Sequence, residues 1–231
     1  MRDRVVLVAG ASGGVGRAIG TELLAVGADV ILLGRSKARL RAAIPPADTE
    51  KAEYLEADLT DEMAIERVRR TVAQRGDLDA LVLSSGIYER SDSPPTFARQ
   101  VAANLLGPYA LIQSLLPMLL KSQGQVVFIN SSQALRAGAT VGQYAATMHA
   151  TKAIADSLRE EVNEKGVRVM TLYLGRTAGD RQERIFELEG RPYTPEKLIQ
   201  PSDVARTVIY LLQMPRTAEV TDLVMRPFQK N

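Results

Sequence analysis

Short runs of apolar residues along this chain alternate with longer stretches in which apolar residues recur at helical spacing. The short runs are rich in Val, Ile and Leu and lack the polar alternation of a half-exposed strand. They are therefore typical of strands buried on both faces of a parallel sheet. Seven such strands are predicted, at residues 5–9, 29–33, 53–57, 80–83, 125–129, 168–174 and 220–225.

Helical patterns fill the intervals between these strands. The predicted helices cover residues 15–26, 37–43, 61–75, 96–120, 143–164 and 202–213. Thr60 and the stretch Pro201-Ser202-Asp203 have the residue types that begin helices. Because strands and helices alternate, the chain is predicted to have an α/β fold: a doubly wound, parallel, seven-stranded Rossmann sheet with helices on both faces, as a single domain over residues 1–231.

The stretch from 175 to 200 is the least regular part of the chain, because several glycines and prolines interrupt its helical spacing. Long irregular segments inside compact domains often cover a ligand. We therefore predict that residues 175–200 form a substrate loop or lid, with an ordinary surface excursion as the alternative.

Composition and charge narrow the chemistry. The net charge of +2 gives no electrostatic reason to expect a nucleic-acid or membrane partner. The absence of cysteine excludes thiolate catalysis, and the single histidine, His149, excludes a multi-histidine site, so no metal is expected. No signal-peptide pattern precedes the first strand and no apolar stretch approaches the roughly 18 residues of a spanning helix, which predicts a soluble, cytoplasmic protein.

A glycine-rich turn follows the first strand and opens the first helix. Glycines allow a tight turn and a close approach of the backbone to a pyrophosphate, and the start of a helix offers free N–H groups and a positive dipole end. This context predicts a phosphate-binding loop, with a turn that is merely tight as the alternative. Its residues are Gly10, Ser12, Gly13, Gly14, Val15 and Gly16.

The spacing of Gly10, Gly14 and Gly16 resembles the fingerprint of the short-chain dehydrogenase/reductase family, and the resemblance runs over most of the chain. Asn104 matches the family's helix asparagine. Ser131 ends the strand that carries the catalytic serine, and Tyr144 follows thirteen positions later, at the place of the catalytic tyrosine. The resemblance implies an oxidoreductase in which tyrosine donates a proton to a small-molecule carbonyl, serine polarises that carbonyl, and a nicotinamide transfers hydride.

The resemblance also implies which residues hold the cofactor. Arg35 follows the second strand, where NAD-preferring members carry an aspartate. A guanidinium suits a 2′-phosphate, so NADP(H) is predicted over NAD(H), with a solvated arginine in a basic run as the alternative. Asp58 matches the family's adenine-contacting aspartate. The remaining implied contacts are Leu59, Ser85, Gly86, Gly175 and Thr177, the last of which lies two positions before the glycine that replaces the family's threonine.

The family's active-site lysine, four residues after the tyrosine, is replaced by Met148. A lysine cation favours the phenolate form of a tyrosine, whose ordinary pKa lies near about 10. Methionine provides no charge. Lys152 is predicted to lie about 12 Å along the helix from Tyr144 and about 80° around it, and His149 about 140° around it, so neither is expected to replace the lysine.

Two functions are therefore expected. The first is an NADP(H)-dependent carbonyl reductase or alcohol dehydrogenase that uses Ser131, Tyr144 and Asn104, with turnover lowered by Met148. The second is a catalytically inactive dinucleotide-binding protein, a sensor or an assembly partner. Because the family often pairs through long helices equivalent to 96–120 and 143–164, a homodimer or homotetramer is expected; the alternative is that these helices only cover the sheet.

Overall fold

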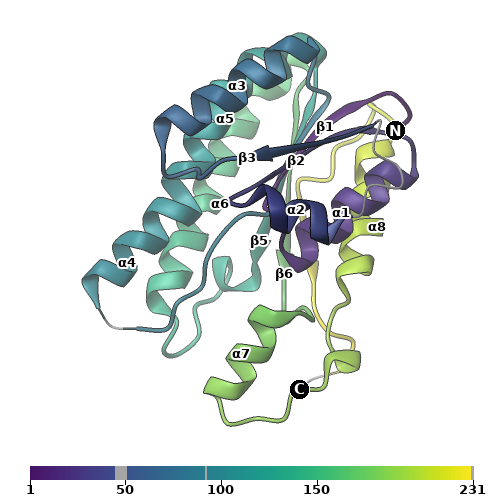
Figure 1. The fold of residues 1–231 in the computed structure, drawn as a ribbon. Coiled ribbons are helices and arrows are strands. Elements are labelled where there is room, and N and C mark those ends of the chain that lie inside the picture. Colours follow the sequence, from purple (N-terminus) through teal and green to yellow (C-terminus); the bar gives the residue numbers. More distant parts are fainter. Residues whose placement is uncertain (45–50, 92, 230–231) are drawn as a thin grey trace.

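The predicted strands form one sheet. The computed structural model describes residues 1–44, 51–91 and 93–229. Within them, seven parallel strands lie in the order β3-β2-β1-β4-β5-β6-β7. Their bounds are β1 Val5–Ala9, β2 Asp29–Gly34, β3 Ala52–Glu56, β4 Ala80–Leu83, β5 Gln125–Ser131, β6 Arg168–Leu174 and β7 Asp222–Met225. The order reverses between β1 and β4, as in a doubly wound sheet, so the predicted Rossmann fold is confirmed (Figure 1).

Helices cover both faces of this sheet. Helices α1, α2 and α8 pack on one face, and α3, α5 and α6 on the other (Figure 1). The α-helices are α1 Gly14–Ala25, α2 Lys37–Ala43, α3 Glu62–Arg75, α4 Pro94–Val101, α5 Gly107–Ser122, α6 Gly142–Val162, α7 Asp180–Leu188 and α8 Pro201–Gln213. Shorter turns are η2 Ala102–Leu106, η3 Ser132–Ala134, η4 Asn163–Lys165 and η5 Pro195–Lys197.

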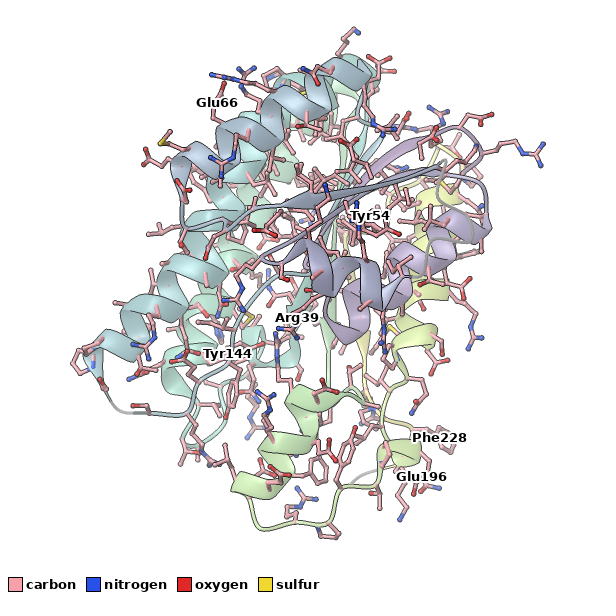
Figure 2. All side chains as sticks on the ribbon, in the orientation of Figure 1. Arg39, Tyr54, Glu66, Tyr144, Glu196 and Phe228 are labelled. Carbon is pink, nitrogen blue, oxygen red and sulfur yellow. The ribbon has the colours of Figure 1, made fainter. Side chains whose placement is uncertain are left out.

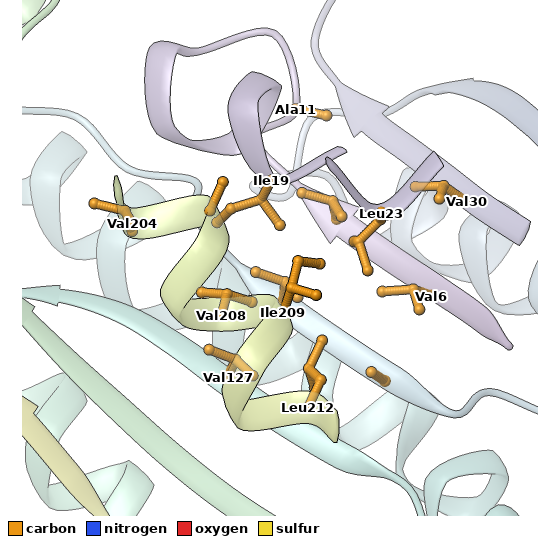
Figure 3. Close-up of a cluster of buried hydrophobic side chains, with 14 of the residues drawn as sticks. Val6, Ala11, Ile19, Leu23, Val30, Val127, Val204, Val208, Ile209 and Leu212 are labelled. Atoms are coloured by element: carbon orange, nitrogen blue, oxygen red, sulfur yellow. The ribbon is translucent and has the colours of Figure 1, made fainter. Parts of the chain in front are cut away.

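The contact between α1 and α8 shows how apolar spacing builds the core. Ile19 and Leu23 of α1 pack with Val208 and Ile209 of α8 over Val6 of β1 (Figure 3). Ile19 and Leu23 lie four positions apart in α1, and Val208 lies four positions from the buried Val204 and Leu212 in α8, so each set lies on one face of its helix. Because helices cover both faces of the sheet, the strands carry apolar side chains on both sides. Polar side chains are therefore expected mainly at the strand ends.

Helix starts follow local side-chain chemistry. Asp61 caps α3, because its carboxylate accepts a hydrogen bond from the Met63 amide at 2.9 Å. The start predicted at Thr60 is one residue early, because the Thr60 hydroxyl donates instead to Asp58 at 2.8 Å. Pro201 occupies the first turn of α8, as its fixed backbone angle favours.

The helix predicted at 96–120 is longer and is interrupted. It runs from Pro94 to Ser122, and the π-helical turn η2 separates α4 from α5. By length and composition alone this helix could cross a membrane, contrary to the expectation that no stretch is apolar enough. Six residues of α5 are buried, four of them, including Leu111 and Leu115, in the core against the sheet, and one such helix is weak evidence for a membrane span.

Segment 175–200 is more regular than predicted. It contains helix α7 and the short turn η5. The helix was missed because it has only nine residues, lies between Gly179 and Gly190, and carries charges on most of its turns. Its one fully buried side chain is Phe186, so the amphipathic signal of this helix is short.

Leu23→Ala tests the contact between α1 and α8. Leu23 is fully buried, and truncating a buried leucine costs about 2–5 kcal/mol of unfolding free energy. Urea unfolding followed by circular dichroism measures this loss. Leu188→Ala, at an exposed position on α7, should change the unfolding free energy by less than about 0.5 kcal/mol. An equal loss in both variants would contradict the assigned core.

Candidate functional site

The glycine loop after β1 is built by close backbone contacts. A Cβ atom on Gly16 would lie 2.3 Å from the Gly10 carbonyl oxygen, and one on Gly10 would lie 2.7 Å from the Ser85 amide nitrogen. Gly10 also has φ of +83°, which L side chains rarely adopt. Only glycine therefore fits at either position, and the loop after β4 is pressed against the loop after β1.

The start of α1 is open for an anion. Its N-cap residue, Gly13, has no side chain to satisfy the first amides of the helix. Ala178 O lies 3.9 Å from the position of a Gly14 Cβ, so segment 175–200 begins directly over this helix start. Ser12 lies against Gly34 at the end of β2. The amide groups at the start of α1 are free to donate hydrogen bonds, and the glycines beside them leave room for a ligand to approach the backbone. This combination fits a pyrophosphate.

The predicted adenine end lies beside β2 and β3. Arg35 is exposed, and its cation helps to lower the pKa of the Asp58 carboxyl, although hydrogen bonds from Thr60 are the larger cause. Both of these hydrogen bonds, from the Thr60 amide and hydroxyl, go to one oxygen of Asp58, so the other oxygen is free of them. Leu59 packs against Gly107, where a Cβ would lie 2.7 Å from the Leu59 carbonyl.

Glu56 was not predicted at this end of the site. It pairs with Gly34 in the β2–β3 register, and its carboxylate accepts a hydrogen bond from the Lys37 amide at 2.7 Å. The Glu56 carboxylate therefore satisfies one of the backbone amides at the start of α2, and it brings a negative charge close to the position of Arg35. The sequence gives no signal for this contact, because it depends on the register of two neighbouring strands.

Beyond β4, Ser85 and Gly86 connect the glycine loop to segment 175–200. The Ser85 hydroxyl is buried and has no hydrogen-bond partner among the described residues. The Gly86 carbonyl accepts a hydrogen bond from the Arg181 guanidinium of α7 at 2.5 Å. An arginine of segment 175–200 thus reaches across to the loop after β4.

The end of β6 supplies Gly175 and Thr177. The Gly175 amide donates to Met225 O, which ties the end of β6 to β7. The Thr177 hydroxyl donates to Gly175 O at 3.1 Å, and Thr177 forms a β-bridge with Ile199. The hydroxyl of Thr177 is therefore engaged with its own backbone.

Ser131 and Tyr144 lie on elements that pack together. Ser131 is the last residue of β5, and its hydroxyl accepts a hydrogen bond from the Gln133 amide at 3.2 Å. Tyr144 is in the first turn of α6, which packs against η3, the turn that directly follows Ser131. The Tyr144 hydroxyl has no hydrogen-bond partner in the described part of the chain. Figure 2 shows Tyr144 toward the end of the molecule that carries α7.

Met148 is part of an apolar cluster beside Tyr144. Its side chain is 8% exposed and packs with Ala134 and Tyr173, and the partly buried Tyr144 packs against the same cluster. Burial raises the pKa of Tyr173, and its hydroxyl donates to Asp222 at 2.7 Å. A packed, uncharged side chain therefore stands where the resemblance predicts the family's lysine.

Lys152 and His149, the two side chains considered as replacements for the lysine, interact with other groups of α6. Lys152 forms an ion pair with Asp156, one turn further along α6, at 2.5 Å. The His149 ring shares a hydrogen bond with Ala145 O of its own helix. Both side chains are thus engaged within α6, and it remains a prediction that neither replaces the lysine.

Asn104 holds other parts of the site in place. Its side chain is 3% exposed, accepts from the Ile87 amide at 2.7 Å, and donates to Ile87 O at 2.9 Å and to the Thr147 hydroxyl at 3.2 Å. It thereby joins η2, the loop after β4, and α6. π-helical turns such as η2 occur frequently at functional sites.

Asn130 makes a second connection that the sequence did not reveal. Its amide donates to Met148 O at 3.2 Å, and its carbonyl oxygen accepts from the Ser131 amide at 2.7 Å. One buried side chain thus ties the end of β5 to the helix that carries Tyr144. An asparagine next to Ser131 gives no such signal in the sequence, since the contact spans eighteen residues.

One aromatic ring contacts Tyr144, and in segment 175–200 arginine side chains pack on another ring. The ring of Tyr88 meets the Tyr144 ring edge-on at 5.1 Å, and burial raises the pKa of Tyr88. In segment 175–200, the guanidinium groups of Arg176 and Arg191 lie 4.8 Å and 5.2 Å from the ring centre of Phe186. The segment therefore has a small core of its own.

Comparisons with known proteins agree with this architecture. The short chain dehydrogenase family model matches residues 4–190. An oxidoreductase of Staphylococcus epidermidis is 29% identical over 233 residues, 98% of each chain. The oxidoreductase YciK of Escherichia coli is 30% identical over 224 residues, covering 92% of this chain and 87% of that one. The crystal structure of an Escherichia coli short chain dehydrogenase with NADPH superposes with a TM-score of 0.87 and 27% identity, covering 97% of each chain.

Gly16→Ala tests the glycine loop. Its Cβ would meet the Gly10 carbonyl, so the loop must shift, and we expect NADPH affinity to fall at least tenfold. Isothermal titration calorimetry measures the affinity, and circular dichroism verifies folding. Gly142→Ala is the control, because nothing lies within 4 Å of its Cβ position. Unchanged affinity in Gly16→Ala would contradict the assignment of this loop.

Proposed function

Because the chain belongs to the short chain dehydrogenase family, we propose that it is an NADP(H)-dependent oxidoreductase acting on a small carbonyl or alcohol. The observation that carries this proposal is the placement of Ser131 and Tyr144, on β5 and on the helix packed beside its end. Oxidoreductases and an NADPH-bound structure among its relatives support the class of reaction and the cofactor.

The residues around the glycine loop fit the dinucleotide. The uncapped start of α1 and the loop Gly10–Gly16 would hold the pyrophosphate, and Arg35 would face the 2′-phosphate of the adenosine ribose. Asp58 and Leu59 would border the adenine. Ser85, Gly86, Gly175 and Thr177 would line the nicotinamide side. When bound, the nicotinamide supplies or takes the hydride.

The proton is handled by the chain's own side chains. In the proposed reduction, the Tyr144 hydroxyl donates its proton to the substrate oxygen, and the Ser131 hydroxyl donates a hydrogen bond to the same oxygen. Asn104 acts as a positioning residue, because both of its amide hydrogens are donated to Ile87 and Thr147 and its oxygen accepts from Ile87. The same tyrosine would have to accept a proton in alcohol oxidation, a role for which Met148 offers no assisting cation.

A second candidate, a dinucleotide-binding protein without turnover, rests on the Met148 cluster. Met148 packs with Tyr173 and Ala134, and Lys152 is paired with Asp156. No cation replaces the lysine by hydrogen bonding or ion pairing with Tyr144 among the described residues. The phosphate and adenine ends of the site do not depend on Met148, so cofactor binding without chemistry fits the same geometry.

Segment 175–200 and the apolar helices complete the proposal. The segment would cover the substrate, because Ala178 lies over the glycine loop and Arg181 reaches Gly86.

Exposed Leu106 and Tyr109 lie where α5 begins, and we infer that this surface pairs two copies of the chain in a homodimer or homotetramer. No nucleic-acid or membrane partner is proposed.

Arg35→Ala tests the cofactor preference. Fluorescence titration of the purified protein with NADPH and NADH should show tighter binding of NADPH. Loss of the guanidinium should weaken NADPH binding about tenfold and leave NADH binding nearly unchanged, because only NADPH carries the 2′-phosphate. The control is Arg67→Ala, an arginine with an exposed side chain on α3. Equal losses for both nucleotides would contradict the proposed role of Arg35, and no binding of either at millimolar concentration would remove both candidate functions.

Met148→Lys separates the two candidate functions. With an ammonium group beside Tyr144, NADPH oxidation with a panel of aldehydes and ketones should rise at least tenfold, since general acid–base catalysis contributes about 10²–10⁴-fold. Met148→Leu keeps the site apolar and should not raise the rate. Tyr144→Phe should abolish any turnover and retain NADPH binding. If no variant turns over any carbonyl and NADPH still binds, the second candidate is correct.

A further inference from the structure

A cavity of about 340 Å³ lies at the amino ends of the strands. It is lined by the segment before β1, the starts of β5 and β6, and the end of α8. The loops that carry the glycine turn, Ser131 and Tyr144 are at the carboxyl ends of the strands. Figure 1 shows the N-terminus at the end of the molecule opposite α7. The cavity is therefore separate from the candidate active site.

Four arginines line this cavity, with a single carboxylate. The carboxylate is Asp79, and it is already engaged: one oxygen pairs with Arg4 at 2.5 Å, and the other accepts from the Val5 amide at 2.8 Å. The other three arginines are Arg2, Arg168 and Arg216. The cavity wall therefore carries an excess of positive charge.

Arg168 is a buried cation without an anionic partner. Its residue is 6% exposed, yet it forms no ion pair among the described residues. Its two terminal nitrogens donate to neutral acceptors: Gln125 Oε1 at 2.6 Å, and the carbonyls of Met214, Pro215 and Ala218 at 3.2–3.3 Å. Its Nε atom is buried and has no hydrogen-bond partner within residues 1–44, 51–91 and 93–229. Buried charges are normally paired, because removing them from water is costly.

The nearest charged neighbours of Arg168 do not compensate this charge. Burial lowers the pKa of Arg168, and the nearby cation of Arg216 lowers it further. Glu219 acts in the opposite direction, but one of its oxygens accepts from the Val169 amide and the other from the Asn163 side chain. The attraction to Glu219 is therefore only long-range.

Two of the lining arginines still have free donors. Arg216 uses one terminal nitrogen for Gly166 O at 2.9 Å, and its other nitrogens make no hydrogen bond within the described ranges. Arg2 makes no side-chain hydrogen bond or ion pair in the part of the chain that the structure describes. Guanidinium groups bind phosphate and carboxylate through paired hydrogen bonds.

We propose that this cavity binds a small anionic molecule through a phosphate or carboxylate group, which Arg2 and Arg216 contact and which offsets the charge of Arg168. A volume of about 340 Å³ lies at the lower end of the range for small-molecule pockets. The site does not depend on the proposed oxidoreductase function, because it shares no residue with the dinucleotide site or with Tyr144.

Thermal unfolding of the full chain tests the proposal. Inorganic phosphate, glycerol phosphate and citrate are each compared with sodium chloride at equal ionic strength. A ligand that binds only the folded protein raises the Tm, and we expect a rise of at least about 2 °C, which is the size of Tm shift that a modest stabilisation gives in a chain of this length. Comparison of the three probes identifies whether a phosphate or a carboxylate is preferred.

Four variants make the test specific. Arg2→Ala/Arg216→Ala, at two exposed positions, should fold and lose the anion-dependent rise. Arg35→Ala, which removes the proposed 2′-phosphate contact, and Gly16→Ala, which shifts the proposed pyrophosphate loop, should keep the rise if the anion does not bind at the dinucleotide site. Arg67→Ala is a matched surface control and should also keep it. Calorimetric titration of phosphate into the same variants should show the same pattern.

Arg216→Glu gives a reciprocal test. A carboxylate at this position would supply the missing counter-charge from within the chain. We expect a higher Tm than wild type in sodium chloride, and no further rise with phosphate. A rise with phosphate that is equal in wild type and in Arg2→Ala/Arg216→Ala would overturn the proposal. No rise with any of the three anions in the wild type would also overturn it.

Discussion

The close approach of three backbone segments at the carboxyl ends of β1 and β4 is the contact on which the candidate site depends. Gly10 touches the loop after β4, and Gly16 touches Gly10. A methyl group at either position would separate these segments. Because the start of α1 is fixed by this contact, so are its free amides. The same contact places Ser85 and Gly86 next to the glycine loop, which brings the two halves of the doubly wound sheet together around one site.

The fold could be predicted from the sequence because the apolar pattern is a local property. Strands buried on both faces read as continuous apolar runs, and six of the seven predicted strands begin within one residue of the observed ones. The exception is the last strand, which begins at Asp222 and not at residue 220. Helix α7 was missed because a short helix with one buried residue, Phe186, has too little apolar periodicity to detect.

The candidate site was predictable only in part. Tyr144, Ser131 and the glycine loop are identified by residue type and spacing, which the sequence contains. The contacts that position them are not: Asn130 reaches Met148 O across eighteen residues, and Glu56 reaches Lys37 through the pairing of β2 with β3. The charge of Arg168 is a similar case, since nothing in its sequence neighbourhood indicates that it is buried among carbonyl groups.

The small core of segment 175–200 has a mechanical consequence. Phe186, two arginines and Glu189 hold one another by ring contacts and ion pairs, and the Tyr193 hydroxyl accepts from the Gly179 amide. These contacts fix the shape of the segment from within, independently of its contacts with the sheet. Its attachments to the rest of the molecule include the single hydrogen bond from Arg181 to Gly86. This hydrogen bond is exposed and comes from one side chain, so breaking it would cost less free energy than disrupting the several internal contacts of the segment.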